Sequence, residues 1–241
     1  MHVPGEIPQE IGRAYAQVLI GCLERSVRFF RCQFEVHEAP EKLTFSAFSG
    51  KEFSLDALAR LSDPSWNCEA LVECKGHKDG SKVFDEYKQF VAKAYCVSVA
   101  YARHKRDCFV FASNVPFGSS IGRRLVSPDF VHQILIDKEN EAVSSLIGAA
   151  PVDTQTAEMV SRSLVIAVYP DSMIRLMGIS YRVKPQESIW SIMKVLHGGK
   201  IPRPYFQPVA ETVAKMNDLT NPDKIKAGQR LHLPWYGLQW E

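Results

Sequence analysis

The chain has 241 residues, 46% hydrophobic and 23% charged, a composition typical of a globular protein with one large domain or a large and a small one. The net charge of +2 is too small to mark a nucleic-acid-binding protein, and no apolar run approaches the roughly 18 residues of a membrane span. The first residues, Met1 to Gly5, lack the basic and apolar regions of a signal peptide. We therefore expect a cytoplasmic protein whose six cysteines are reduced, buried thiols.

Helical and strand-like hydrophobic patterns alternate over most of the chain. The expected elements, in chain order, are a helix at 9–31; strands at 34–36, 43–48, 53–59 and through Glu73; a helix at 82–96; a strand at 108–113; helices near 139–148 and 154–163; and a strand at 164–169. Strands interleaved with helices indicate an α/β core.

The pattern changes after Gly178, where a small unit is expected. Its elements would be a strand at 181–183, helices at 188–196 and 209–216, and a strand at 230–233. This order predicts a separate βααβ domain, so the chain would divide into domains at 1–177 and 178–236. The aromatic tail at 235–240 is unusually apolar for a terminus, and we expect it to pack on the body or on a second subunit of a homo-oligomer.

The strand through Glu73 carries the candidate chemistry. Side chains alternate faces along a strand, so Glu73 and Lys75 point the same way. Asp56 lies on the preceding predicted strand, and antiparallel pairing would bring it to the same sheet end as Glu73. Mg²⁺ prefers carboxylates, keeps several waters and accepts phosphate oxygens, while a lysine supplies fixed positive charge. The spacing predicts a site for phosphodiester hydrolysis with Mg²⁺, or Mn²⁺ in its place.

The stretches FSLDALARL and CEALVECKG, which hold these residues, resemble the PD-(D/E)xK nuclease superfamily and its Mrr-like restriction enzymes. The resemblance implies a restriction-endonuclease-like mixed sheet flanked by helices. It assigns catalytic roles to Asp56, Glu73, Lys75 and Gln89, and metal ligation to Asp56, Glu73, Glu10 and the backbone carbonyl of Cys74. Leu55 stands where the family has a proline.

A basic segment follows this strand. Between Lys75 and Arg106, eight Lys and Arg residues stand against three acids. Such a cluster is either a solvated face or a surface for the DNA backbone, and its position beside Glu73 favours phosphate contact. The lysines expected to contact DNA are Lys78, Lys82, Lys88 and Lys93.

The small unit contains YRVKPQESIWSI, NDLTNPDKI and GQRLHLP, which together resemble a LysM domain. That resemblance implies a shallow groove for N-acetylglucosamine-containing glycans between two loops. The residues it assigns to the groove are Gln186, Glu187, Ser188, Asn221, Asp223 and Ile225. Gln186 replaces the usual glycine, and the link between the helices is longer than usual. Docking of a protein partner and a purely structural role remain alternatives.

Two functions follow from these residues. The first is a metal-dependent nuclease acting on DNA, in defence against foreign or phage DNA, with the LysM module for sensing, localisation or assembly. The alternative is a non-catalytic glycan- or partner-binding protein, in which the LysM module is the working site and the nuclease fold is a scaffold.

Overall fold

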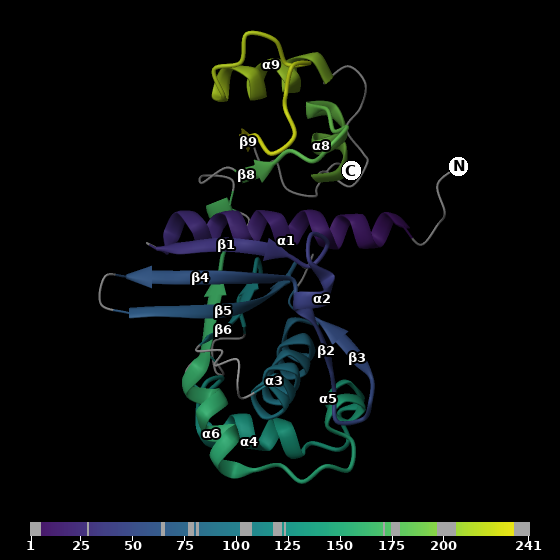
Figure 1. Ribbon diagram of the computed structural model, residues 1–241, viewed down its shortest axis with the longest axis vertical. Helices are drawn as coiled ribbons and strands as arrows, with labels where there is room; N and C mark the ends of the chain where they lie inside the picture. Colours follow the sequence, from purple (N-terminus) through teal and green to yellow (C-terminus); the bar gives the residue numbers. More distant parts are fainter. Residues whose placement is uncertain are drawn as a thin grey trace. The chain divides into compact units, whose positions relative to one another are not determined.

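The computed structural model describes residues 6–27, 29–63, 66–76, 80, 82–101, 108–117, 122, 124–170, 172–174, 179–196 and 206–233. Contacts divide the chain into two units (Figure 1). We call Val27–Val168 the sheet unit, and Met1–Ser26 with Tyr169–Glu241 the terminal unit. The sequence placed the boundary at 177/178 and the whole N-terminal part in the first domain, whereas the contacts group residues 1–26 with the C-terminal part.

The sheet unit is built on a mixed five-stranded sheet in the order β1-β4-β5-β6-β7. The strands are β1 (Phe30–Glu35), β4 (Ala57–Asp63), β5 (Trp66–Lys75), β6 (Cys108–Ser113) and β7 (Leu164–Val168). β4 pairs antiparallel with both β1 and β5, whereas β5, β6 and β7 run parallel. Parallel neighbours need crossover connections, which helices supply here. The predicted α/β class with a mixed sheet is therefore confirmed.

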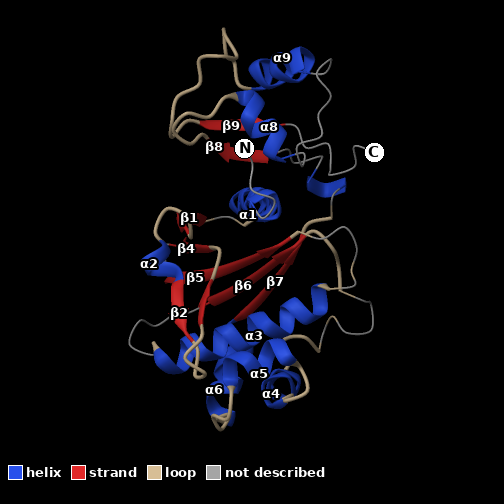
Figure 2. Ribbon diagram, turned by 90° about the vertical axis from the view of Figure 1, so that its right-hand side faces the viewer, coloured by secondary structure: helices blue, strands red, loops and turns tan. Residues whose placement is uncertain are grey.

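Helices gather on one face of this sheet (Figure 2). They are α3 (Val83–Ala100), α4 (Pro128–Ile136), α5 (Glu141–Ile147) and α6 (Thr154–Ser163). The short helix α2 (Pro40–Leu43) and the hairpin of β2 (Thr44–Ser46) and β3 (Glu52–Ser54) lie between β1 and β4 in the chain. Tyr87, Phe90 and Phe111 belong to the buried core between α3 and the sheet, and their rings pack together. Asn140 and Asp153 cap α5 and α6 through their side chains.

Two expectations for local structure are wrong, and one helix was not expected. The helix expected over 9–31 ends at Ser26, because Phe29 adopts a φ of +76° and the chain then pairs with β4 as β1. The strand expected at 53–59 is two strands, β3 and β4, with Leu55 and Asp56 between them. No helix was expected at α4, whose short apolar stretch follows a proline at its first turn.

The terminal unit comprises α1 (Glu6–Ser26), β8 (Ile179–Arg182), α8 (Ile189–Leu196), α9 (Phe206–Met216) and β9 (Arg230–Leu233). β8 and β9 pair antiparallel, and the predicted βααβ order is confirmed. Alternate residues of β9, Leu231 and Leu233, are fully buried, together with Met193 of α8. The helix α1 contacts β8 and α8, so it belongs to this unit although it lies at the other end of the sequence.

No disulfide joins the six cysteines, five of which are buried. Among the described helices, none is long and apolar enough to cross a membrane. The aromatic tail at 235–240 lies outside the described residues.

Candidate active site

The pairing of β4 with β5 brings Asp56 next to Glu73. Ala57 lies opposite Val72, so Asp56, one residue before β4, comes to the strand position opposite Glu73. Three hydrogen bonds hold Asp56 there: its N–H donates to the Val72 carbonyl (2.9 Å), its carbonyl accepts from Val36 (2.8 Å), and its Oδ2 accepts from the Cys74 N–H (2.7 Å). The two predicted carboxylates therefore share one end of the sheet.

Glu73 is almost completely buried, with 2% of its surface exposed. Its Oε1 accepts from two ammonium groups, Nζ of Lys75 at 2.9 Å and Nζ of Lys93 at 2.8 Å. Its Oε2 is also buried and has no hydrogen-bond partner among the described residues. One oxygen of the carboxylate is thus doubly neutralised, whereas the other is desolvated without compensation, a costly state for a charged group.

Lys93 is the residue whose location differs most from expectation. The sequence assigned it to the DNA backbone, but its side chain lies inside the sheet unit, bonded to Glu73 and, at 3.0 Å, to the carbonyl of Ser54. The reason is its position three residues after Phe90 and four before Val97, both buried, which places it on the inward face of α3. This spacing is the sequence signal that would have found it.

Charge and burial set different pKa values within this cluster. Burial and the neighbouring Glu73 raise the pKa of Asp56 to about 6, despite opposing contributions from Lys75, the Cys74 N–H and Lys93. Burial acts to raise the pKa of Glu73 as well, but Lys93 and Lys75 outweigh it and hold that pKa below its usual value. Burial acts to lower the pKa of Lys75, and Glu73 and Asp56 reverse this and raise it. The cluster therefore keeps Glu73 ionised and Lys75 protonated.

The remaining predicted residues around this cluster have varied environments. Gln89 is half-buried and lies one helical turn before Lys93, on the same side of α3. Lys82 is exposed just before α3, consistent with a surface contact. Lys88 lies 4.0 Å from Asp85 and 3.8 Å from Asp137, so ion pairs on the surface of α3 already engage it.

Two predicted residues cannot be placed. Lys78 lies outside the described residues, as does the side chain of Glu10, whose backbone belongs to α1.

Sequence reasoning also missed Glu86, an acid in the first turn of α3 that is close enough to contribute to raising the pKa of Lys75.

The cluster fits a hard divalent cation. Among the described residues, no three His, Cys, Asp or Glu side chains gather as a metal site. Mg²⁺ does not need such a set, because it is usually held by one or two carboxylates, waters and substrate phosphates. Asp56 and Glu73 supply the two carboxylates, and the buried Oε2 of Glu73 offers an oxygen that no described residue uses. The buried thiol of Cys74, with its raised pKa, is not suited to bind such an ion, so only its carbonyl remains a candidate.

In the terminal unit, the predicted glycan-binding residues form two turns. The Glu187 carboxylate accepts from the Tyr181 hydroxyl and from the Lys184 N–H, each at 2.7 Å. Ser188 caps α8, as its Oγ accepts from the Ser191 N–H at 3.1 Å. Gln186 is exposed with a φ of +66°, which explains why a glycine would suit this position. These contacts define the shape of the first loop.

The second loop is built in the same way. Asn221 Oδ1 accepts from the Asp223 N–H at 2.8 Å, which forms a side-chain-supported turn. Asp223 is exposed and Ile225 half-buried. Three of the six predicted residues, Glu187, Ser188 and Asn221, therefore have identified roles in holding the loops.

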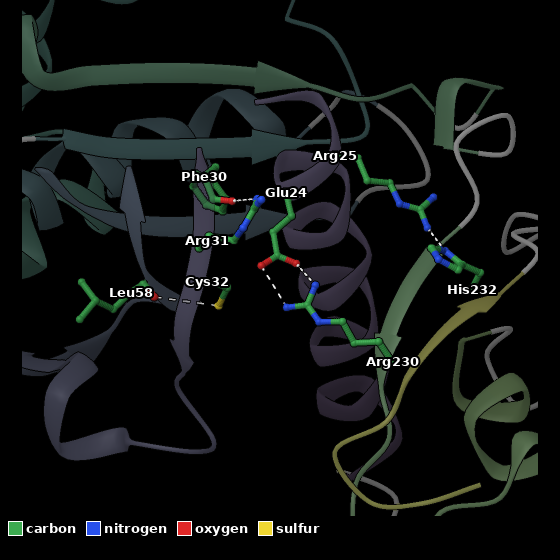
Figure 3. Close-up of polar contacts among 8 residues, drawn as sticks. All are labelled: Glu24, Arg25, Phe30, Arg31, Cys32, Leu58, Arg230 and His232. Carbon is green, nitrogen blue, oxygen red and sulfur yellow. Dashed lines mark hydrogen bonds and ion pairs between the residues drawn. The ribbon is translucent and has the colours of Figure 1, made fainter. Parts of the chain in front are cut away.

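Within the terminal unit, polar side chains join helix α1 to strand β9 (Figure 3). The guanidinium of Arg230 on β9 pairs with both oxygens of Glu24, at 2.8 and 3.3 Å. Arg25 also contacts the His232 ring. Glu24, one of the acids in the first predicted helix, is thus engaged within the terminal unit.

Asn217 covers the outer edge of β9. Its amide donates to the His232 carbonyl and its Oδ1 accepts from the His232 N–H, both at 2.6 Å, which replaces a third strand. We expect Asn217→Ala to lower the free energy of unfolding of this unit by about 1–3 kcal/mol, because the backbone groups of His232 lose their partner. Thermal unfolding would measure this. Gln207→Ala, which removes one exposed side-chain hydrogen bond, is the control and should be nearly neutral; equal losses would contradict the role of Asn217.

Comparison with known proteins identifies only the C-terminal part. The family model of the LysM domain matches residues 210–234, which run from α9 to the end of β9. No curated protein and no solved structure matches the chain, and none of the comparisons shows a PD-(D/E)xK domain. The chain therefore carries a LysM domain, a module that binds glycans or mediates localisation.

Proposed function

We propose that the sheet unit is a metal-dependent nuclease of the PD-(D/E)xK type, joined to a LysM module that localises it or senses a glycan or partner. The observation that carries this proposal is the arrangement of Glu73. It lies beside Asp56 at one sheet end, has one oxygen without a partner among the described residues, and shares a strand face with Lys75. The DNA substrate and a role in defence against foreign DNA are part of the proposal.

In the proposed hydrolysis, each residue of the cluster would have a separate role. Asp56 and Glu73 would hold Mg²⁺ or Mn²⁺, and such an ion, when bound, neutralises charge on the phosphodiester and lowers the pKa of an attacking water. Lys75, whose side chain is 27% exposed, can reach a substrate phosphate and stabilise the charge that develops on its oxygens. Gln89, half-buried on the same side of α3 as Lys93, would help to orient the water.

One observation favours the second function, a non-catalytic binding protein. Lys75 and Lys93 balance the formal charges of Asp56 and Glu73, so the cluster also has the composition of a buried ion network that holds the fold without metal. The LysM module would then be the working site for N-acetylglucosamine-containing glycans.

Calorimetric titration of the chain with metal ions distinguishes the nuclease from the non-catalytic binding protein. We expect the wild-type chain to bind Mn²⁺ and Mg²⁺ at one saturable site, and Asp56→Asn to lose that binding, because one of the two carboxylates becomes neutral. Asp85→Asn is the control, since Asp85 is an exposed acid on α3 and should leave the affinity unchanged. Absence of a metal site, together with saturable binding of chito-oligosaccharides, would overturn the nuclease proposal and support the second function.

A further inference from the structure

The buried ammonium of Lys93 connects two parts of the candidate active site. Its Nζ lies 2.8 Å from Oε1 of Glu73 on β5 and 3.0 Å from the carbonyl of Ser54, the last residue of β3. Ser54 precedes Asp56 by two residues, and Leu55 between them is completely buried. A single side chain of α3 therefore ties the strand that carries one acid to the short segment that carries the other.

Lys75 and Lys93 bind the same oxygen but differ in access to solvent. The side chain of Lys75 is 27% exposed, whereas that of Lys93 is 10% exposed and lies over the ring of Phe53. A group that must meet a phosphate or a water needs the access that Lys75 has. Lys93 lacks it, and its donors are directed at the Glu73 carboxylate and a backbone carbonyl.

The geometry points to Lys93 as a positioning residue that fixes Glu73 relative to Asp56, so that Oε2 of Glu73 would stay available to a bound cation. The effect of Lys93 on metal binding rests on the proposed function. The hydrogen bonds by which Lys93 connects Glu73 to Ser54 do not depend on a metal. It replaces the DNA-backbone contact that the basic segment suggested for this lysine.

A positioning role and a mere charge effect predict opposite signs for metal affinity. Removing a positive charge beside a cation site would by itself tighten cation binding, because repulsion between the ammonium and the ion is lost. Removing a group that orients a ligand instead weakens metal binding, typically by 10–100-fold for residues behind the ligands. The direction of the change in Kd for Mn²⁺ therefore identifies the role.

The test uses Lys93→Met, which keeps most of the length of the side chain without the ammonium group, and Lys93→Arg, which keeps a charged donor. Lys88→Met, on the surface of the same helix, is the matched control. We expect Lys93→Met to weaken Mn²⁺ binding by about tenfold or more, Lys93→Arg to restore part of the loss, and Lys88→Met to leave Kd unchanged. Tighter binding or an unchanged Kd in Lys93→Met would overturn the positioning role.

Hydrogen exchange of the metal-free chain gives an independent measurement. Lys93→Met should speed exchange of the amides around Asp56 and Cys74 relative to the wild type and to Lys88→Met, because the tie to Ser54 and Glu73 is lost. Unchanged exchange of these amides in Lys93→Met would overturn the inference, whatever the result of the Mn²⁺ titration. If the wild-type chain binds no Mn²⁺ but exchange rises as expected, the proposed nuclease function fails while the structural tie stands.

Discussion

Substitution of Lys75 by Met is expected to reduce Mg²⁺-dependent cleavage of plasmid DNA by at least about 100-fold, the usual cost of removing one group that stabilises transition-state charge. Glu73 keeps its second ammonium partner, Lys93, so the carboxylate remains ionised in the variant. The loss should therefore appear in the rate of the chemical step, with Mn²⁺ affinity unchanged or tighter. Initial cleavage rates at saturating Mg²⁺, together with Mn²⁺ titration, measure both quantities.

The matched control for this variant is Lys42→Met. Lys42 is an exposed lysine of the same unit whose ammonium lies 3.7 Å from the centre of the Phe34 ring. The Lys42→Met variant should cleave plasmid DNA at the wild-type rate. Equal cleavage by the wild type and Lys75→Met would remove Lys75 from the mechanism.

A second large effect is expected on stability. Glu73→Ala should lower the free energy of unfolding by about 3–5 kcal/mol, the range found when one partner of a buried ion pair is removed. The cause is Lys93, whose buried ammonium would lose the carboxylate at 2.8 Å and keep, among the described residues, the Ser54 carbonyl as its hydrogen-bond acceptor. Chemical denaturation of the wild type and the variant would give the difference.

Glu73→Gln is the control for this effect, because it keeps the volume and one acceptor oxygen for the two ammonium groups. It should be less destabilising than Glu73→Ala while still losing a charged ligand. If Glu73→Ala unfolds at the same denaturant concentration as the wild type, the cluster does not hold the fold together.

The strand periodicity sufficed to predict the shared face of Glu73 and Lys75, because a period of two is a local property of β5. The antiparallel approach of Asp56 also followed, since β4 and β5 are consecutive strands and pair from Asp63 with Trp66 onward. The LysM module was found through its sequence motifs, and the match to residues 210–234 agrees with it. These features follow from sequence motifs and from the pairing of strands that are consecutive in the chain.

Other features depend on contacts between distant residues, and local patterns failed there. The apolar spacing that begins α1 continues past Ser26, but pairing with β4 makes Phe30–Glu35 a strand. Lys93 was assigned to the surface by its charge, whereas its place on the inner face of α3 decides its burial. The grouping of α1 with the LysM part arises from partners more than 200 residues away, such as Arg230 with Glu24.

The most direct measurement of the central claim is an anomalous difference map from crystals of the wild-type chain grown with Mn²⁺. We expect one strong peak between the carboxylates of Asp56 and Glu73, close enough for both side chains to coordinate the ion directly. A map with no peak there, or with Mn²⁺ bound only elsewhere, would contradict the claim that these two acids form a metal-dependent catalytic site.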